Sequence, residues 1–391
     1  QIPSVHGRHE SGRVVPEGRM KIVLIGPVYP YRGGIAHYTT QLAKSLLAAG
    51  HDVKVISFKR QYPGWLYPGQ SDRDPSHEPL TVQADYLLDP LYPWTWRNAV
   101  TTIQRDSPDL VLFQWWTTFW AFAFGYIGRA LHKRQIRTGY LIHNVIPHEA
   151  RPWDRFLAKM ALRHGDAFLV QSSGQQEALQ KLIPAAKPDL IELPVYDMFA
   201  AQKMDQGTAR RKLALPENVP LVLFFGIVRP YKGLALLLEA MGQLHTAGYQ
   251  VGLYIAGEFW EDVQKYRGQI DRLHLTGQVW IDNRYIPNEE LPVIFSAADV
   301  FAAPYTDATQ SAAVKMALGF GLPIVVTAVV VNESMQPWIN RRVFVCSAED
   351  TATIVDALKQ ALSLAPTENL PVSSMASWTA VIEELERLVS E

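Results

Sequence analysis

The chain of 391 residues is too long for one ordinary core and predicts two domains of about 150–200 residues each. Apolar residues make up 48% and charged residues 19%, which indicates a globular chain and excludes a disordered one. The formal net charge of −1 argues against a nucleic-acid-binding protein, because contacts with phosphates need an excess of basic residues. The single cysteine, Cys346, excludes an internal disulfide and a cysteine-rich metal site, and fits a reducing, cytoplasmic compartment.

Residues 1–19 are polar and contain no apolar stretch, so they do not resemble a signal peptide. We expect them to be a disordered arm or a cloning remnant, with Met20 as the native start. Residues 110–128 form the longest uncharged stretch, about long enough to span a bilayer. Because Gln114, Thr117 and Thr118 interrupt this stretch, we favour a strand followed by a helix over a transmembrane helix.

Residues 20–195 alternate short apolar stretches with segments of helical spacing, which predicts the first domain. "KIVLIG" (21–26) is typical of a buried parallel strand, and the segment 35–50 predicts a helix that ends at Gly50. The alternation continues with predicted strands at 53–58, 109–115, 139–143, 167–172 and 189–194, and with helices near 118–133 and 154–164.

The same alternation restarts in residues 196–375, after a polar linker near 195–215. Strands are predicted at 219–226, 251–257, 299–304 and 322–327, and helices at 234–248, 288–298 and 311–321. Residues 376–391 contain an amphipathic helix that we expect to pack back on the first domain. The fold class is therefore α/β, with two doubly wound parallel sheets that face one another across a cleft and bind ligands at the carboxyl ends of their strands.

Two loops at these strand ends combine glycines with a helix start. Gly33 and Gly34 precede the first helix, where backbone N–H groups and the helix dipole can bind an anion, although paired glycines also make plain turns. In "GIVRPYKG" (226–233), Arg229 and Lys232 follow a strand that ends at Gly226. This pair suits a diphosphate, and the alternative is a solvated basic turn.

Two further loops offer polar side chains. His143 ends a predicted strand and is followed by Asn144, His148 and Glu149, a spacing that matches no zinc site. The alternative for His143 is a hydrogen-bonded residue at a strand end. Glu258 follows a strand end at Gly257, where it could simply cap a helix. The chain contains neither a phosphate-binding Walker loop nor the dinucleotide fingerprint.

These loops together resemble the family 4 glycosyltransferases, group 1 type, of the GT-B architecture. The resemblance rests on "YPYRGGIAHYTTQLAKSLLAAGHDVKVIS", "GIVRPYKGLALLLEAM", "SAADVFAAPY" and "ALGFGLPIVVT", and it extends from about residue 20 to the end of the chain. Their order and spacing, more than any one of them, make the match specific.

The resemblance implies a retaining transfer from a nucleotide-diphosphate sugar, with no metal and no other cofactor. Arg229 and Lys232 match the pair that neutralises the leaving diphosphate, and His143 matches a histidine near the transferred sugar. In the mechanism commonly proposed for such enzymes, the leaving phosphate accepts the proton of the acceptor. The predicted donor contacts are Gly33, Gly34, Gly226, Glu258, Asp307, Thr309, Gln310 and Ser311.

The donor loop "DATQSAAVKMALGFG" (307–321) departs from the family pattern. Two glutamates, one for the donor sugar and one for the ribose, are usual there, but this chain has Ala308 and Met316. Val330 and Val331 likewise replace a usual double glycine. The "ATQS" loop is similar to a subgroup without the glutamates, so we expect backbone amides, Thr309 and Ser311 to hold phosphate and Asp307 to contact the sugar.

The acceptor is expected in the first domain, and the predicted contacts are Tyr31, Trp115, Trp116 and Asn144. Much of the aromatic run "FQWWTTFWAFAFGY" (113–126) is interpreted as core, with a peripheral membrane contact as the alternative. The acceptor could be a glycan, a lipid-linked molecule or a small molecule. A catalytically inactive homologue and another GT-B enzyme, such as a sugar-nucleotide epimerase, are the alternative functions.

Overall fold

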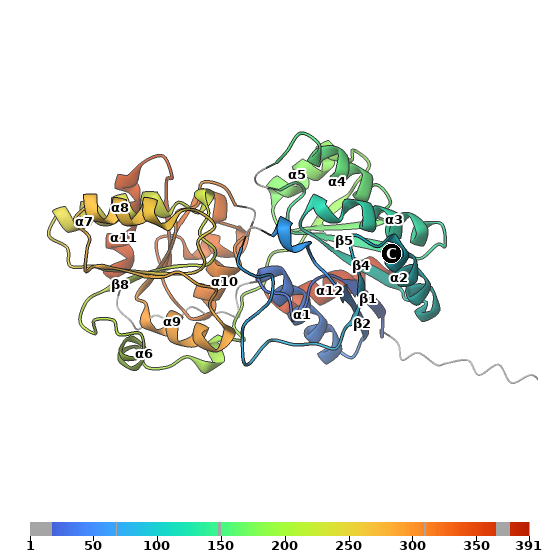
Figure 1. Cartoon of the computed structure of the whole chain (residues 1–391), viewed down its shortest axis with the longest axis horizontal. Coiled ribbons are helices and arrows are strands. Elements are labelled where there is room, and N and C mark those ends of the chain that lie inside the picture. The colour runs from blue at the N-terminus through green and yellow to red at the C-terminus, as the bar shows by residue number, and fades with distance from the viewer. Residues whose placement is uncertain (1–17, 68, 148–149, 309, 365–375, 391) are drawn as a thin grey trace, which may run out of the picture.

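The computed structural model describes residues 18–390, except 68, 148–149, 309 and 365–375. Two domains lie side by side, and each contains a parallel β-sheet with helices on both faces (Figure 1). This confirms the two doubly wound sheets that the alternating pattern predicts. Residues 110–128 form a strand and a helix, and no helix in the described part of the chain is long and apolar enough to cross a membrane.

The first domain has a seven-stranded sheet in the order β3-β2-β1-β4-β5-β6-β7, with every pair parallel. Its strands are β1 (Lys21–Ile25), β2 (Asp52–Phe58), β3 (Asp85–Leu88), β4 (Leu110–Trp115), β5 (Thr138–Ile142), β6 (Ala167–Val170) and β7 (Pro188–Leu190). Its helices are α1 (Gly34–Ala48), α2 (Pro93–Asp106), α3 (Ala121–His132), α4 (Asp154–Leu162) and α5 (Ser173–Leu182).

The second domain has a six-stranded parallel sheet in the order β10-β9-β8-β11-β12-β13. Its strands are β8 (Leu221–Phe225), β9 (Gly252–Ala256), β10 (Val279–Asp282), β11 (Val300–Ala303), β12 (Ile324–Thr327) and β13 (Val343–Cys346). Its helices are α6 (Gln206–Lys212), α7 (Leu234–Thr246), α8 (Val263–Arg272), α9 (Leu291–Ala297), α10 (Ala312–Gly319) and α11 (Thr351–Leu362).

The last helix, α12 (Trp378–Ser390), returns to the first domain and packs beside α1 (Figure 1). The ring of Trp378 lies 5.1 Å from that of Tyr38 in α1, and Arg387 forms a 2.8 Å ion pair with Asp189 in β7. The chain therefore crosses between the domains twice.

The strand orders determine where a ligand can bind. In each sheet the order reverses beside the first strand of the domain, between β1 and β4 and between β8 and β11. The loops that follow β1 and β8 leave the sheets at these switch points, where ligands of doubly wound folds bind. These are the two glycine loops that the sequence singles out.

Candidate functional site

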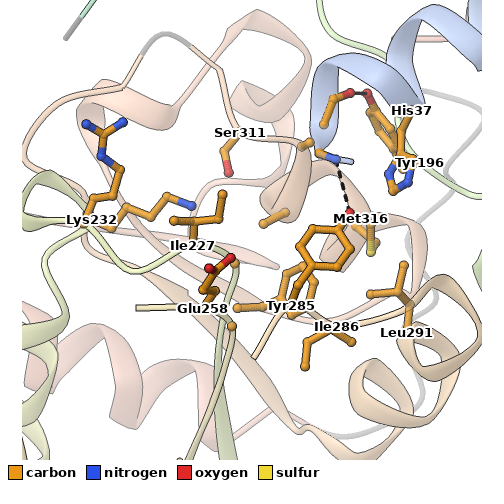
Figure 2. Close-up of a pocket in the computed structure, with 18 of the residues that line it drawn as sticks. His37, Tyr196, Ile227, Lys232, Glu258, Tyr285, Ile286, Leu291, Ser311 and Met316 are labelled. Atoms are coloured by element: carbon orange, nitrogen blue, oxygen red, sulfur yellow. Dashed lines mark hydrogen bonds between the residues drawn. The ribbon is translucent and has the colours of Figure 1, made fainter. Parts of the chain in front are cut away.

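A cavity of about 320 Å³ lies between the domains, at the carboxyl ends of both sheets. The first domain contributes Gly33, Gly34 and His37, and the second contributes the larger part of the lining. Figure 2 shows Lys232 and Glu258 at one end of the cavity and Ile286, Leu291 and Met316 at the other. The cavity thus has a polar end and an apolar end.

The loop after β1 places backbone N–H groups at the cavity wall. Gly33 caps α1 with φ 103°, a conformation that favours glycine. Its N–H donates to the Tyr285 hydroxyl of the second domain at 3.1 Å (Figure 2). A Cβ atom on Gly34 would lie 3.4 Å from Cβ of Ala312, so the first turns of α1 and α10 approach each other across the cleft.

The loop after β8 places both cations on the cavity. The Lys232 ammonium lies 5.4 Å from the ring centre of Tyr305, and the Arg229 guanidinium lies 5.4 Å from that of Trp260. A Cβ atom on Gly226 would stand 3.0 Å from Nζ of Lys232, so the glycine leaves room for the ammonium. Burial, with a smaller contribution from Arg229, lowers the pKa of Lys232.

The positive charge of this cavity does not come from these two side chains alone. Helices α1, α7 and α10 all begin beside it, and none has an acidic residue in its first turn. Helix N-termini carry partial positive charge and exposed N–H groups. Ser311, also at the cavity, caps α10 by accepting a 3.3 Å hydrogen bond from the Val314 amide. The arrangement favours a ligand with several negative charges.

Glu258 is the one carboxylate among the described residues that line the cavity, and both of its oxygens have partners. Oε2 forms an ion pair with Arg32 of the first domain, and Oε1 accepts a 2.8 Å hydrogen bond from the Gln70 amide. Glu258 therefore neutralises Arg32 and links the two domains. The expected contact between Glu258 and the donor stays a prediction.

Position 316 presents a thioether to the cavity. Met316 is 4% exposed and lines the apolar end with Ile286 and Leu291. The neighbouring Lys315 points away from the cavity into the protein, and its ammonium lies 3.4 Å from the Ser334 hydroxyl. Burial lowers the pKa of Lys315 to about 8, and the nearby Glu192 opposes this. Neither side chain replaces the missing carboxylate.

Only some of the other residues of the donor loop line the cavity. Gln310 lines the cavity, and its side-chain amide donates to the Gln171 carbonyl of the first domain at 2.6 Å. Asp307 is exposed and does not belong to the lining. Thr309 lies outside the described residues. The structure therefore brings Ser311 and Gln310 to the cavity but leaves Asp307 at the surface.

His143 is buried and does not belong to the lining of the cavity. Its Nε2 is 2.7 Å from the Gln114 side-chain oxygen, and its ring packs edge-on against Tyr38 at 5.1 Å. Burial lowers the pKa of His143 to about 4, so the imidazole is neutral at physiological pH. The expected contact between this side chain and the transferred sugar stays a prediction.

Two of the four predicted acceptor contacts are core residues. Trp115 is fully buried and donates from its indole to the Val145 carbonyl at 3.2 Å, while the Tyr31 hydroxyl donates to the Phe58 carbonyl at 2.8 Å. Along β4, Trp115 shares a face with Val111 and Phe113, which pack against the helices of that face. Its position at a strand end therefore does not open it to the cleft.

The other two predicted acceptor contacts are partly exposed. The Trp116 indole donates to the Tyr62 hydroxyl at 2.9 Å. Asn144 follows His143 at the end of β5. Neither residue lines the cavity between the domains.

Three of the cavity residues that were not predicted from the sequence carry polar groups near the loop after β1. His37, on α1, lies 3.9 Å from the Asp74 carboxylate, and Tyr196 and Tyr285 place their hydroxyls beside Gly34 and Gly33. Figure 2 shows all three around one side of the cavity. Their only signal in the sequence is a polar or aromatic residue next to a predicted helix or strand, which many other residues share. Among the described residues, the His, Cys, Asp and Glu side chains form no group of three that could hold a metal ion.

Two family models match the chain, one in each domain. The model described as "Glycosyltransferase Family 4" matches residues 32–195, and the model described as "Glycosyl transferases group 1" matches residues 219–363. The sequence matches no curated protein.

Solved structures share the fold across nearly the whole chain. Sucrose-phosphate synthase from Thermosynechococcus elongatus is 22% identical, with a TM-score of 0.69 over 95% of this chain and 98% of that one. The HepE protein of Anabaena, in complex with UDP and glucose, is 17% identical, with a TM-score of 0.70 over 95% and 100%. The catalytic domain of starch synthase IV from Arabidopsis thaliana, bound to ADP and acarbose, is 15% identical, with a TM-score of 0.63 over 95% and 100%.

Proposed function

The chain belongs to the group 1, family 4 glycosyltransferases, and from this we propose that it transfers a sugar from a nucleoside-diphosphate sugar to an acceptor hydroxyl. The donor would occupy the cavity between the domains. The observation that carries the proposal is the convergence of Arg229, Lys232 and three helix N-termini on a cavity whose one described carboxylate is already paired.

The two ends of the cavity suit the two parts of a nucleotide. The diphosphate fits the cationic end, and the nucleoside fits the apolar end formed by Ile286, Leu291 and Met316. As the bond to the sugar breaks, negative charge grows on the leaving diphosphate, and fixed cations stabilise it. We propose that these groups replace a metal ion in this role.

The transfer is proposed to retain the anomeric configuration. A double-displacement mechanism needs a free carboxylate as nucleophile beside the sugar, and Glu258 is engaged by Arg32 and Gln70. A leaving phosphate held between Arg229 and Lys232 can instead accept the proton of the acceptor on the same face of the sugar.

Calorimetric titration with UDP, GDP and ADP, in the presence of EDTA, tests the donor site. One of the three nucleotides should bind, and Arg229→Ala/Lys232→Ala should raise its Kd at least about 100-fold, since each charge-assisted contact contributes about 1.5–3 kcal/mol. Arg211→Ala/Lys212→Ala removes two exposed cations from α6 and serves as the matched control. If no nucleotide binds, or if both double variants lose equal affinity, the proposal is wrong.

A further inference from the structure

A second cavity, of about 650 Å³, lies mainly on the first domain, and we call it the groove. Neither the family models nor the fold assigns a ligand to it. Its lining comes from the starts of α2, α3 and α4 and from the segments 62–66, 90–91 and 117–120. Its lining is largely aromatic and aliphatic and includes Tyr62, Leu66, Leu91, Trp96, Phe122 and Trp153. Its volume lies within the range of about 300–1,000 Å³ that is typical of pockets for small molecules.

The rim of this groove is unusually apolar for a protein surface. The described part of the chain exposes fifteen large apolar side chains, and four of them, Leu66, Leu91, Phe122 and Trp153, line the groove. Phe122 is 61% exposed, Trp153 55% and Leu91 48%. Contiguous patches of this kind mark interaction sites, because water would otherwise cover them at a cost in free energy. Core packing therefore does not explain these residues.

Two of the three charged residues of the described lining are basic. They are Arg151, whose guanidinium lies 5.8 Å from the ring centre of Trp153, and Arg229. Asp154, the one acidic residue among the described residues of the lining, is buried and hydrogen-bonded to Thr118 and to the Arg151 amide. A ligand with an apolar chain and a phosphate would complement both features.

Arg229 connects this groove to the donor cavity, because it lines both of them. A molecule that lies in the groove can therefore place its polar end beside the position proposed for the donor diphosphate. Glycosyl transfer needs an acceptor hydroxyl at that point.

We infer that the groove holds the apolar chain of a lipid-linked acceptor, joined through phosphate to the group that carries the acceptor hydroxyl. The inference rests on the proposed function and narrows its acceptor class. A concave groove fits a single lipid chain better than it fits the flat surface of a bilayer. Arg151 then faces the phosphate, and the hydroxyl-bearing end extends toward Arg229.

Two probes test this inference: farnesyl phosphate below its critical micelle concentration, and isopentenyl phosphate, which has the same head and a short chain. Farnesyl phosphate should bind in a 1:1 ratio and at least about 100-fold more tightly, because each additional buried methylene adds affinity. Phe122→Ser, in the groove, should weaken this binding about tenfold. Phe156→Ser is the matched control, since Phe156 is as exposed as Phe122 but lies outside the lining, and it should change the Kd less than about twofold.

Several results would overturn the inference. They are the absence of saturable binding, similar affinity for the two probes, and equal losses in the two variants. Equal losses together with binding to phosphatidylglycerol vesicles would assign the surface to a bilayer instead. Nucleotide titration of the same proteins separates the two proposals, because intact nucleotide binding without farnesyl phosphate binding contradicts only the acceptor assignment.

Discussion

Arg32 of the first domain and Glu258 of the second form an ion pair across the cleft, with side-chain exposures of only 5% and 4%. The Arg32 guanidinium also lies 4.7 Å from the ring centre of Tyr285, while the Gln70 amide donates to the second oxygen of Glu258. The pair therefore joins the two domains at the polar end of the donor cavity.

Glu258→Gln should loosen this contact between the domains. Removing one partner of a buried ion pair costs about 3–5 kcal/mol when the other charge stays buried. Opening of the cleft returns Arg32 to water and avoids that cost. We therefore expect amide hydrogen exchange at Gln70 and Gly33, whose N–H groups both cross the cleft, to accelerate at least about 30-fold.

Peptide-level mass spectrometry measures this exchange. Glu217→Gln is the control, because it breaks the exposed pair with Arg211, whose side chains are 45% and 58% exposed, and exposed pairs contribute little. Unchanged exchange at Gln70 and Gly33 in Glu258→Gln would show that other contacts keep the cleft closed.

Nucleotide binding should be coupled to proton uptake by Lys232. Burial lowers the pKa of this ammonium in the free protein, and a bound diphosphate would raise it again. As the pH rises toward the usual lysine pKa of about 10.4, the neutral fraction of Lys232 is larger in the free protein than in the complex, so binding takes up protons and affinity falls. Calorimetry near about pH 9, in buffers with different ionisation enthalpies, measures the number of protons taken up.

Lys232→Met should abolish this proton uptake and weaken binding, whereas the exposed Lys212→Met should leave both unchanged. Equal proton uptake in wild type and Lys232→Met would mean that another group titrates on binding. It would also place the diphosphate away from Lys232.

Met316 should leave the ribose hydroxyls without a carboxylate partner, because its thioether is at best a weak acceptor. Wild-type protein should therefore bind the preferred nucleoside diphosphate and its 2′-deoxy form with affinities within about threefold of each other. Met316→Glu should favour the ribonucleotide by about tenfold, since a hydrogen bond to a charged group contributes about 1.5–3 kcal/mol.

Met316→Gln is the control for size in this experiment, and it should discriminate less than Met316→Glu. Strong discrimination by the wild type would show that another group recognises the ribose. Both variants should also lower the melting temperature without ligand, because they bury a polar group in an apolar wall.

The fold could be predicted because its signals are local. Apolar stretches of strand length alternate with helical spacing, and Gly26 and Gly226 end the strands at which the sheet order reverses. Arg229 and Lys232 line the cavity because they directly follow one of these strands. For these two residues, the position in the loop that follows a strand was enough to predict that they line the cavity.

The contacts between the domains could not be predicted, because they join residues far apart in the chain. Arg32 and Glu258 are separated by 226 positions, and neither loop alone indicates its partner. Trp115 was assigned to the cleft because it ends a strand. The alternation of side chains along β4 instead directs it to the face covered by α3, where Phe124 lies 6.4 Å away.

His143 should make the protein less stable in acid. Its pKa in the folded state is about 4, below the usual value of about 6.5 that we assume for the unfolded chain, because burial disfavours the charged form. Between these two values the unfolded chain binds a proton that the folded protein does not. Stability is therefore complete above about pH 6.5 and is lost as the pH falls toward about 4.

Between pH 7 and pH 5 the loss due to His143 should be about 2 kcal/mol. Urea denaturation at both pH values measures it as the change in the free energy of unfolding. His143→Gln removes the titrating group and should reduce the pH dependence by that amount, whereas replacement of the exposed His77 by glutamine should not. An unchanged dependence in His143→Gln would mean that water or a nearby group lets the imidazole take up a proton in the folded protein. In that case His143 could still exchange protons during turnover, and its role in catalysis would need to be tested directly by kinetics.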